Sequence, residues 1–236
     1  MLIAEDLRLE RSGREIFHIE NLTIQQGEVL ALVGPNGAGK SSLLLTLAML
    51  ETPSGGVVRF AGEAALNGNR LGMRRRMAVV FQEAMLLDTS VQRNITIALR
   101  IRGVASGEAA QRAQKWLDRF GIGHLARRPA RQLSGGEAQR ASLARAFALE
   151  PEVLFLDEPF AALDYPTRKA LLNELGPMLK GMNMTALFVT HDYTEIPYLA
   201  QRVAVLYEGR IIKCGSVVEV FGEEILSRRI WVPWED

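Results

Sequence analysis

A glycine-rich stretch that also carries a lysine and serines has the residue types needed to bind phosphate. It lies between the apolar residues 29–33 and a helix-like run at 42–50, and it consists of Gly34, Pro35, Asn36, Gly37, Ala38, Gly39, Lys40, Ser41 and Ser42. Glycines let successive backbone N–H groups point at one anion without a Cβ in the way, and a following helix presents its positive end to that anion. The pattern G-x-x-x-x-G-K-S between a strand and a helix therefore predicts a phosphate-binding loop.

The two residues that end this pattern have distinct expected roles. Lys40 would supply positive charge to the β- and γ-phosphates of a nucleotide, and the Ser41 hydroxyl could ligate Mg²⁺. The alternative is a glycine-rich turn that binds nothing. The lysine, the serine and the flanking strand and helix patterns all favour the phosphate loop.

Two carboxylates end a second apolar run and could complete such a site. Asp157 and Glu158 follow residues 153–156, whose apolar character suits a central strand of a parallel sheet. Ligands in such sheets bind at the carboxyl ends of strands. We therefore expect Asp157 to hold Mg²⁺ through its water shell and Glu158 to polarise the attacking water and accept its proton. The alternative is a pair of acidic residues at a surface strand end, which the phosphate loop disfavours.

Two further polar residues follow apolar runs. Gln82 comes after residues 77–81, and His191 comes after residues 185–190. Gln82 could reach Mg²⁺ or the attacking water, although its local sequence alone favours a surface residue. His191 could donate a hydrogen bond to the γ-phosphate, whereas a lone histidine is usually structural.

A second helix start also has anion-binding character. Ser134, Gly135 and Gly136 precede an alanine-rich helix expected at residues 138–149. A serine followed by glycines at a helix start can cap the helix and bind an anion. Either the two anion-binding helix ends face each other within one chain, or the second serves a nucleotide bound to another subunit.

The bulk properties exclude several classes of protein. The net charge of +1 provides no strong field for nucleic acid or an anionic membrane. The single cysteine, Cys214, rules out an internal disulfide and fits a reducing compartment. No signal peptide is apparent, and the longest apolar helix-like run is far shorter than the ~20 residues needed to span a bilayer. Any membrane role is therefore expected to depend on partners.

The remaining pattern indicates an α/β protein, and 236 residues can form one large domain or two closely joined lobes; we expect a single domain over residues 1–236. Residues 1–33 read as short strands of a small antiparallel sheet joined to the core. Residues 94–132 have helical spacing and read as an inserted helical subdomain, with Trp116 expected to pack rather than bind a ligand. The nucleotide-binding core would then comprise 1–93 and 133–236. A helical pattern occupies 217–226, the arginines at 74–76 are expected to form a solvated edge, and Trp231 and Trp234 carry no functional assignment.

In order, the stretches GPNGAGKSS, FQE, LSGGEAQR, VLFLDEP, ALD and VTHD resemble the ATP-binding subunit of an ABC transporter over roughly residues 2–221. The resemblance implies a P-loop NTPase core with a mainly parallel sheet, an N-terminal antiparallel β-subdomain and an inserted α-helical subdomain. It also implies ATP and Mg²⁺ as cofactors and a head-to-tail homodimer with a second copy of the chain. Lys40 and Ser41 of one copy would then hold the same nucleotide as Ser134–Gly136 of the other. Gln82 would sense Mg²⁺ and link the core to the helical subdomain, and Asp164 would cross the dimer interface.

The resemblance further implies partners. Residues 84–87 would line a groove for a coupling helix of a membrane-spanning permease. A free-standing subunit of this kind resembles those of bacterial importers, which work at the cytoplasmic face of the cell membrane with an extracytoplasmic solute-binding protein. Residues 82–87 and 190–197 resemble the tungstate and molybdate group of importers. The chain stops soon after Phe221, so we expect no additional regulatory domain.

Two points of the resemblance stay open at the level of sequence. The family usually places an adenine-stacking aromatic residue where this chain has Arg11 and Ser12, and an arginine plane could stack on a base instead. The alternatives to an importer subunit are a soluble ABC ATPase of translation or DNA maintenance and a mechanotransmitting subunit, such as one that releases lipoproteins. The absence of a second ATPase unit and of a long coiled-coil insertion disfavours the soluble class.

Overall fold

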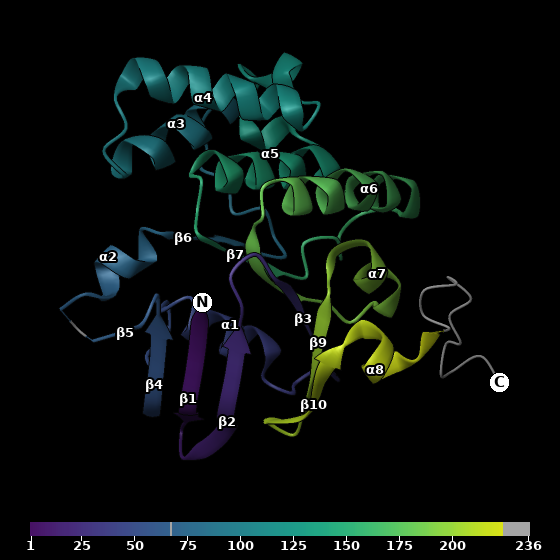
Figure 1. Cartoon of the computed structure of the whole chain (residues 1–236). Coiled ribbons are helices and arrows are strands. Elements are labelled where there is room, and N and C mark those ends of the chain that lie inside the picture. The colour runs from purple at the N-terminus through teal and green to yellow at the C-terminus, as the bar shows by residue number, and fades with distance from the viewer. Residues whose placement is uncertain (67, 224–236) are drawn as a thin grey trace. The chain divides into compact units, whose positions relative to one another are not determined.

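The computed structural model of the chain describes residues 1–66 and 68–223 (Figure 1). Trp231 and Trp234 lie outside these residues, as does the end of the helical pattern at 217–226. The described chain forms two compact units. We refer to residues 1–74 and 169–223 as the first unit and to residues 75–168 as the second unit.

The first unit contains an antiparallel sheet with the strand order β2-β1-β4-β5. Its strands are β1 (Leu2–Arg11), β2 (Arg14–Ile24), β4 (Gly55–Phe60) and β5 (Glu63–Ala64). The central strand β1 pairs with both long neighbours, since Leu2 lies opposite Ile24 of β2 and opposite Phe60 of β4. The turn between β1 and β2 has positive φ at Ser12 (51°) and Gly13 (75°), which is typical of a tight hairpin.

A local irregularity in β1 keeps its apolar side chains on one face. Leu2 and Ala4 are buried, and the alternation then shifts by one residue so that Leu7 and Leu9 are buried as well. The shift falls at Asp6, whose φ is 47°. An extra residue of this kind reverses which side chains face the core, so it lets one continuous strand replace the separate short strands that the sequence suggested.

The first unit also contains strands in the order β10-β9-β3-β8. They are β3 (Val29–Val33), β8 (Thr185–Val189), β9 (Arg202–Tyr207) and β10 (Arg210–Ser216). Strand β3 is parallel to both β8 and β9, whereas β10 returns antiparallel to β9. Every residue of β3 and β8 is buried, which explains why both read as continuous apolar runs.

Short helices accompany these strands in the first unit. They are α1 (Lys40–Leu47), α2 (Arg70–Arg74), the 3-10 turn η3 (Tyr193–Glu195), α7 (Ile196–Leu199) and α8 (Val217–Phe221). Helix α8 ends before the helical pattern does, because Gly222 follows with a φ of 79°. The longer α6 (Tyr165–Gly181) begins in the second unit and continues into the first.

The second unit combines a parallel strand pair with packed helices. Strand β6 (Met77–Val80) pairs with β7 (Val153–Asp157). The α-helices of the unit are α3 (Val91–Ile101), α4 (Ser106–Arg119) and α5 (Gly135–Ala148). Two 3-10 turns, η1 (Gly123–Leu125) and η2 (Ala130–Gln132), lie between α4 and α5 in the sequence. Helices α3, α4 and α5 pack against one another. Trp116 is buried against the rings of Phe120 and Phe147, with centroid distances of 6.2 and 5.2 Å, so it contributes to packing.

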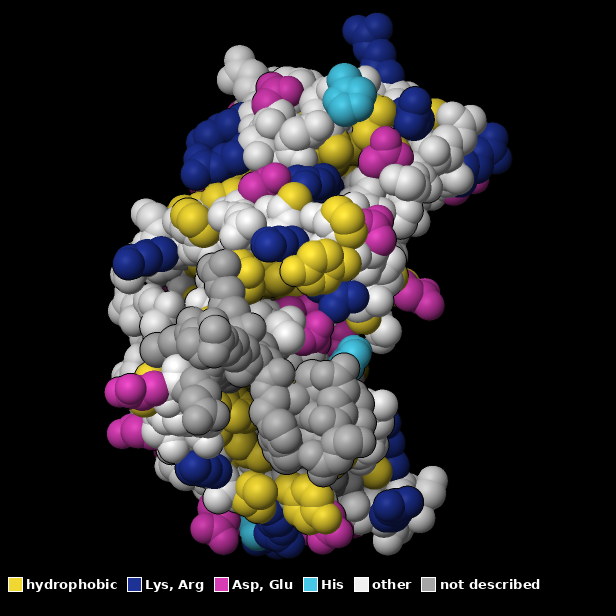
Figure 2. All heavy atoms as spheres, turned by 90° about the vertical axis from the view of Figure 1, so that its right-hand side faces the viewer, with side chains coloured by type: hydrophobic (Ala, Val, Ile, Leu, Met, Phe, Trp, Pro, Cys, Tyr) yellow, Lys and Arg dark blue, Asp and Glu magenta, His cyan; other side chains and the backbone are white. Residues whose placement is uncertain are grey.

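The fold class predicted from the sequence is confirmed: strands and helices form a mixed α/β protein with an antiparallel N-terminal sheet and mainly parallel buried strands. None of the described helices has both the length and the apolar character required to cross a membrane. On the face drawn in Figure 2, basic (dark blue) and acidic (magenta) side chains both occur among the described atoms, in keeping with the net charge of +1.

Candidate functional site

The phosphate loop follows β3 directly and depends on glycine at its first position. The φ of Gly34 is 152°, and a Cβ added there would lie 1.9 Å from the carbonyl oxygen of Leu206. No other residue fits this approach of two backbones. Gly39 has a φ of 99° and lies against β2, where an added Cβ would be 3.2 Å from the carbonyl oxygen of Ile16. The loop is therefore shaped by its neighbours β9 and β2 as well as by its own sequence.

Helix α1 presents a positive terminus to this loop. Its N-cap residue is Gly39, which provides no side-chain cap, and its first turn contains no acidic residue. The N–H groups of that turn and the positive end of the helix dipole therefore face the loop without a neutralising carboxylate from the helix itself. Lys40 is the first helical residue and is 6% exposed, so a buried ammonium adds to the positive potential.

Of the two residues near the expected adenine position, Arg11 already has a hydrogen-bond partner. Arg11 donates hydrogen bonds from Nε and a terminal nitrogen to the carboxylate of Glu51, at 2.7–3.0 Å. Such a forked pair fixes the plane of the guanidinium. Ser12 lies in the tight turn between β1 and β2 and is exposed. The stacking role considered for Arg11 would require it to leave Glu51.

His191 follows the last strand residue of β8 by two positions and is exposed. The residues on either side are fixed by a small hydrogen-bond network. The hydroxyl of Thr190 donates to the buried carboxylate of Glu195 at 2.6 Å and accepts from the backbone N–H of Asp192 at 2.9 Å. The backbone that carries the imidazole is therefore held at the strand end.

The two carboxylates lie at the end of β7 in the second unit. Asp157 is the last residue of the strand and is 9% exposed. Glu158 has a φ of 45°, in the left-handed region that a glutamate rarely adopts. Such backbone conformations cost about 1–3 kcal/mol and are concentrated at functional sites. The apolar run before Glu158 predicts its position at a strand end, but no residue pattern indicates the strained backbone.

Helix α5 begins with a capping box. Ser134 is its N-cap: the Ser134 hydroxyl accepts from the backbone N–H of Glu137 at 3.3 Å, and the Glu137 carboxylate accepts from the backbone N–H of Ser134 at 2.8 Å. The backbone N–H of Ser134, and after it the Ser134 hydroxyl, which donates to the same carboxylate at 2.9 Å, hold the pKa of Glu137 below its ordinary value. The start of α5 thus already carries an anionic group, in contrast to the start of α1.

The remaining predicted residues of the second unit are Asp164 and Gln82. Asp164 accepts from the backbone N–H of Thr167 at 2.9 Å and from its hydroxyl at 3.0 Å, so it caps the start of α6. The same two bonds, in that order, lower the pKa of Asp164. Gln82 is exposed in the loop after β6. The side chains of Met85 and Leu87 in that loop are also exposed, at 62% and 51%.

The predicted site residues thus divide between the two units. The first unit carries Gly34–Ser42 and His191, and the second carries the signature turn (Ser134–Gly136) together with Gln82, Asp157, Glu158 and Asp164. A sequence model of the ABC transporter family matches residues 17–161, more than half of the chain.

The chain belongs to the ABC transporter family.

Among characterised proteins, this family member is similar to import ATP-binding proteins. It is 39% identical over 208 residues to the molybdate/tungstate import ATP-binding protein of Thermococcus kodakarensis, an alignment that covers 87% of this chain and 62% of that protein. It is 42% identical over 220 residues to the sulfate/thiosulfate import ATP-binding protein of Brucella melitensis biotype 1, covering 91% of this chain and 61% of that protein. The chain therefore spans about three fifths of the length of these relatives.

Solved structures agree with this assignment. CbiO1 from Clostridium perfringens, part of an ABC transporter complex, has a TM-score of 0.86 at 32% identity, with 96% of this chain and 92% of that chain covered. A dimeric ATP-binding cassette in a post-hydrolysis state, bound to ADP and Pi, has a TM-score of 0.82 at 26% identity, with 92% and 99% covered. The resemblance drawn from the motifs is confirmed.

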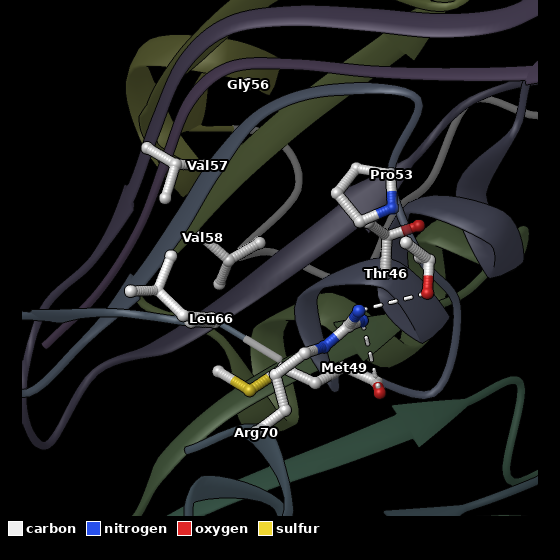
Figure 3. Close-up of a pocket in the computed structure, with 10 residues that line it drawn as sticks. Thr46, Met49, Pro53, Gly56, Val57, Val58, Leu66 and Arg70 are labelled. Atoms are coloured by element: carbon white, nitrogen blue, oxygen red, sulfur yellow. Dashed lines mark hydrogen bonds between the residues drawn. The ribbon is translucent and has the colours of Figure 1, made fainter. Parts of the chain in front are cut away.

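A pocket of the first unit lies at the other end of α1, away from the phosphate loop (Figure 3). Apolar side chains line it, among them Met49, Val58 and Leu66. Figure 3 shows Arg70 reaching from α2 toward Met49, and its guanidinium donates to Thr52 Oγ1 at 3.0 Å and to the Glu51 carbonyl at 2.9 Å. Arg70 thereby satisfies carbonyls after the end of α1, and the pocket lacks the chemistry of a nucleotide site.

The residues present fit Mg-ATP. Among the described residues, no group of three or more histidine, cysteine, aspartate or glutamate side chains forms a dedicated metal cluster. Mg²⁺ that travels with nucleotide phosphates needs only one or two oxygen ligands from the protein. A serine hydroxyl and an aspartate carboxylate, such as those of Ser41 and Asp157, are oxygen ligands of that kind. The glycines of the loop contribute no Cβ to the space that a phosphate would enter.

Proposed function

We propose that this chain is the ATP-hydrolysing subunit of an import system, which powers solute movement through a separate membrane permease. The observation that carries the proposal is the start of α1, where a glycine loop, a buried lysine and an uncapped helix terminus without acids converge. That combination suits a polyphosphate. The import ATP-binding proteins among its relatives support the transport role.

In the proposed mechanism the side chains divide the work between binding and proton transfer. Lys40 would hold the β- and γ-phosphates, and Ser41 and Asp157 would hold Mg²⁺, which neutralises charge on the phosphate oxygens. Glu158 would orient the attacking water and accept its proton, Gln82 would contact Mg²⁺ and the water, and His191 would donate a hydrogen bond to the γ-phosphate. The positive φ of Glu158 supports this role, because strained backbone of that kind is concentrated at functional sites.

The proposed active form is a head-to-tail homodimer in which two nucleotides are sandwiched. The signature turn Ser134–Gly136 of one copy would close over the nucleotide held by the loop of the other, and Asp164 would lie at the interface. Ser134 and Asp164 are both exposed and both cap helices, so each side chain lies at a preorganised helix start. Closure would depend on ATP and would be released by hydrolysis.

The proposed partners follow from the same function. The exposed apolar side chains of Met85 and Leu87 suit contact with a coupling helix of the permease. An extracytoplasmic solute-binding protein would deliver the solute, and the chain would lie at the cytoplasmic face of the membrane. An oxyanion such as molybdate or tungstate is the proposed solute, and the sulfate relatives make sulfate part of the same test. Residues 94–132 would form the helical subdomain of the single ATPase domain.

The test is to trap the closed state with Glu158→Gln. This variant should bind Mg-ATP, lose hydrolysis and sediment as a dimer, because the water is no longer deprotonated. Glu20→Gln, which alters an exposed glutamate of β2, is the matched control and should hydrolyse ATP at the parent rate. Parent-like hydrolysis by Glu158→Gln would contradict the proposed role. Reconstitution with a candidate membrane permease from the same organism, assayed with molybdate, tungstate and sulfate, tests the transport function and the solute.

A further inference from the structure

The loop after β6, residues 82–87, is held through its backbone carbonyls by one arginine. Arg145 of α5 donates a hydrogen bond to the carbonyl oxygen of Met85 at 2.9 Å and another to that of Ala84 at 3.2 Å. Its second terminal nitrogen also lies 3.5 Å from the Ser142 hydroxyl on the same helix. Burial lowers the pKa of the Arg145 guanidinium, yet an arginine remains protonated in a protein. A partly buried cation thus donates to two carbonyls of a largely exposed loop.

The loop conformation needs such support. Met85 has a φ of 43°, which is unfavourable for a methionine, and its side chain is 62% exposed. Burial of the side chain therefore does not offset the strain. Strained backbone persists only where its surroundings over-determine it, and here the surroundings are the two hydrogen bonds from Arg145.

The far end of the loop is fixed independently. Asn94 of α3, which is 1% exposed, accepts from the backbone N–H of Leu87 at 2.7 Å and donates to the Leu87 carbonyl at 3.1 Å. Its amide also donates to the Ser90 carbonyl at 3.1 Å. The loop is therefore anchored to α3 at one end and to α5 near its middle.

Helix α5 connects this anchor to the signature turn. Arg145 lies eleven residues after Ser134, which corresponds to about 16 Å along a continuous helix. Most of the intervening apolar residues are buried, so α5 is expected to move as a rigid rod. A displacement of its first turn would then reach the Met85 carbonyl through a single side chain.

We propose that Arg145 is a positioning residue that ties the backbone of loop 82–87 to α5, so that movement of the signature turn changes the exposed Met85 and Leu87 surface. The proposal rests on the proposed function, in which the signature turn closes on a partner's nucleotide. It assigns Arg145 no contact with nucleotide or metal. Its distinct prediction is that loss of Arg145 uncouples the loop from closure without preventing closure.

The first test measures the anchor without nucleotide, by hydrogen exchange of a peptide that covers residues 82–88. Arg145→Met should raise exchange of the loop amides about tenfold, because loss of both carbonyl bonds lets the strained loop open locally and exposes its N–H groups to water. Arg145→Lys should be intermediate, since an ammonium lacks the fork that spans two carbonyls. The matched control is Arg140→Met, whose arginine lies on the same helix but donates to the Phe120 carbonyl, and it should leave the loop unchanged. Parent-like exchange in both Arg145 variants would overturn the proposal.

The second test measures coupling with a spin label. In a Cys214→Ser background the chain has no other cysteine, so Met85→Cys can be labelled alone. Combined with Glu158→Gln, the label should change mobility when Mg-ATP induces the dimer. Adding Arg145→Met should preserve dimerisation by sedimentation and abolish the change in mobility. A label that still responds as in the parent would refute the coupling role.

These readouts separate the two proposals. Failure of Glu158→Gln to dimerise with Arg145 intact counts against the proposed function, whereas the exchange measurement without nucleotide still decides whether Arg145 holds the loop. Unfolding midpoints of all variants are measured in parallel. If Arg145→Met does not fold, Arg145→Lys decides the outcome: intermediate exchange with a reduced label response supports the proposal, and parent values for both overturn it.

Discussion

The ammonium of Lys40 donates hydrogen bonds to the carbonyl oxygens of Gly34, at 2.9 Å, and Pro35, at 3.0 Å. The lysine at the start of α1 therefore folds back over its own loop. A buried ammonium among carbonyl oxygens is satisfied, but a phosphate oxygen is a better partner because it also carries charge. The loop is thus arranged to exchange neutral acceptors for an anion without a large rearrangement.

Lys40→Ala should weaken the phosphate site. Loss of a preorganised charged donor is expected to reduce Mg-ATP hydrolysis by about 10²–10³-fold, by analogy with the removal of one donor from an anion-stabilising site. Steady-state hydrolysis and equilibrium nucleotide binding measure the effect. Lys180→Ala, an exposed lysine in the last turn of α6, is the control and should retain parent values. Equal activity of the two variants would remove Lys40 from the proposed mechanism.

Gly34→Ala should destabilise the fold more than Gly37→Ala does. At Gly34 a Cβ would meet the Leu206 carbonyl oxygen at 1.9 Å, whereas at Gly37 nothing lies within 4 Å. The Gly37 variant should lose only the free energy needed to hold an alanine in the left-handed backbone conformation, about 1–2 kcal/mol. The Gly34 variant adds a backbone clash and should cost about 3 kcal/mol or more. Urea unfolding with a constant m-value measures both, and equal costs would contradict the close approach of the two backbones.

Glu137→Gln should lower stability in a pH-dependent manner. The folded-state pKa of Glu137 is lowered by its bonds to Ser134, so its charge stabilises the native state above about pH 4.3, the ordinary glutamate pKa. That contribution disappears as the pH falls through the lower folded value. A glutamine keeps the capping geometry but not the charge at the helix terminus. The variant should therefore lose up to about 1 kcal/mol at pH 7 and nothing at pH 2, as measured by urea unfolding at both values.

Arg11→Ala should change ATP affinity by less than about twofold. Arg11 is held by both carboxylate oxygens of Glu51, so stacking on a base would require breaking a charge-assisted pair. Because the Arg11 side chain is 53% exposed and that of Glu51 is 21% exposed, loss of the pair should also cost no more than about 1 kcal/mol of stability. Fluorescent-nucleotide competition with ATP and GTP measures the affinity. A tenfold loss specific to ATP would show that Arg11 leaves Glu51 to bind adenine.

Features that depend on a few neighbouring residues could be predicted from the sequence. The phosphate loop, the buried strands β3, β7 and β8 and the cap at Ser134 each have a local pattern, and the structure places an element at each. The end of α8 also has a local cause, Gly222, although the helical pattern of the sequence continues beyond this glycine.

Features that depend on distant residues could not be predicted. Arg145 reads as a polar position in an alanine-rich helix, and only the fold brings it to a loop sixty residues earlier. Arg11 was open to base stacking because its partner Glu51 lies forty residues away. The positive φ of Met85 and Glu158 likewise has no signature in residue type. In each case tertiary contacts decide what the local sequence leaves free.

The head-to-tail arrangement makes a prediction that mixed dimers can decide. Ser134→Arg places a long cation at an exposed helix start and removes an N-cap, so it should damage the signature turn while leaving the first unit able to bind nucleotide. Pairing a Ser134→Arg chain with a Lys40→Ala chain leaves one intact loop and one intact signature turn on different copies. Those two should complete one site, and in a Glu158→Gln background the mixed dimer should retain one ATP through gel filtration.

The reciprocal dimer is the matched control. In this dimer one chain carries both Ser134→Arg and Lys40→Ala, and the other carries neither. If the copies share sites, each of the two nucleotide sites contains one substitution, and the dimer should retain no ATP. If each copy closes its own site, the outcomes are reversed: the reciprocal dimer keeps one ATP and the first pairing keeps none. A Ser134→Ala chain in place of Ser134→Arg separates loss of the cap from obstruction, because it removes the hydroxyl without adding bulk. The two dimers contain the same substitutions in different combinations. Unequal folding of the variants therefore cannot produce a difference in ATP retention between them.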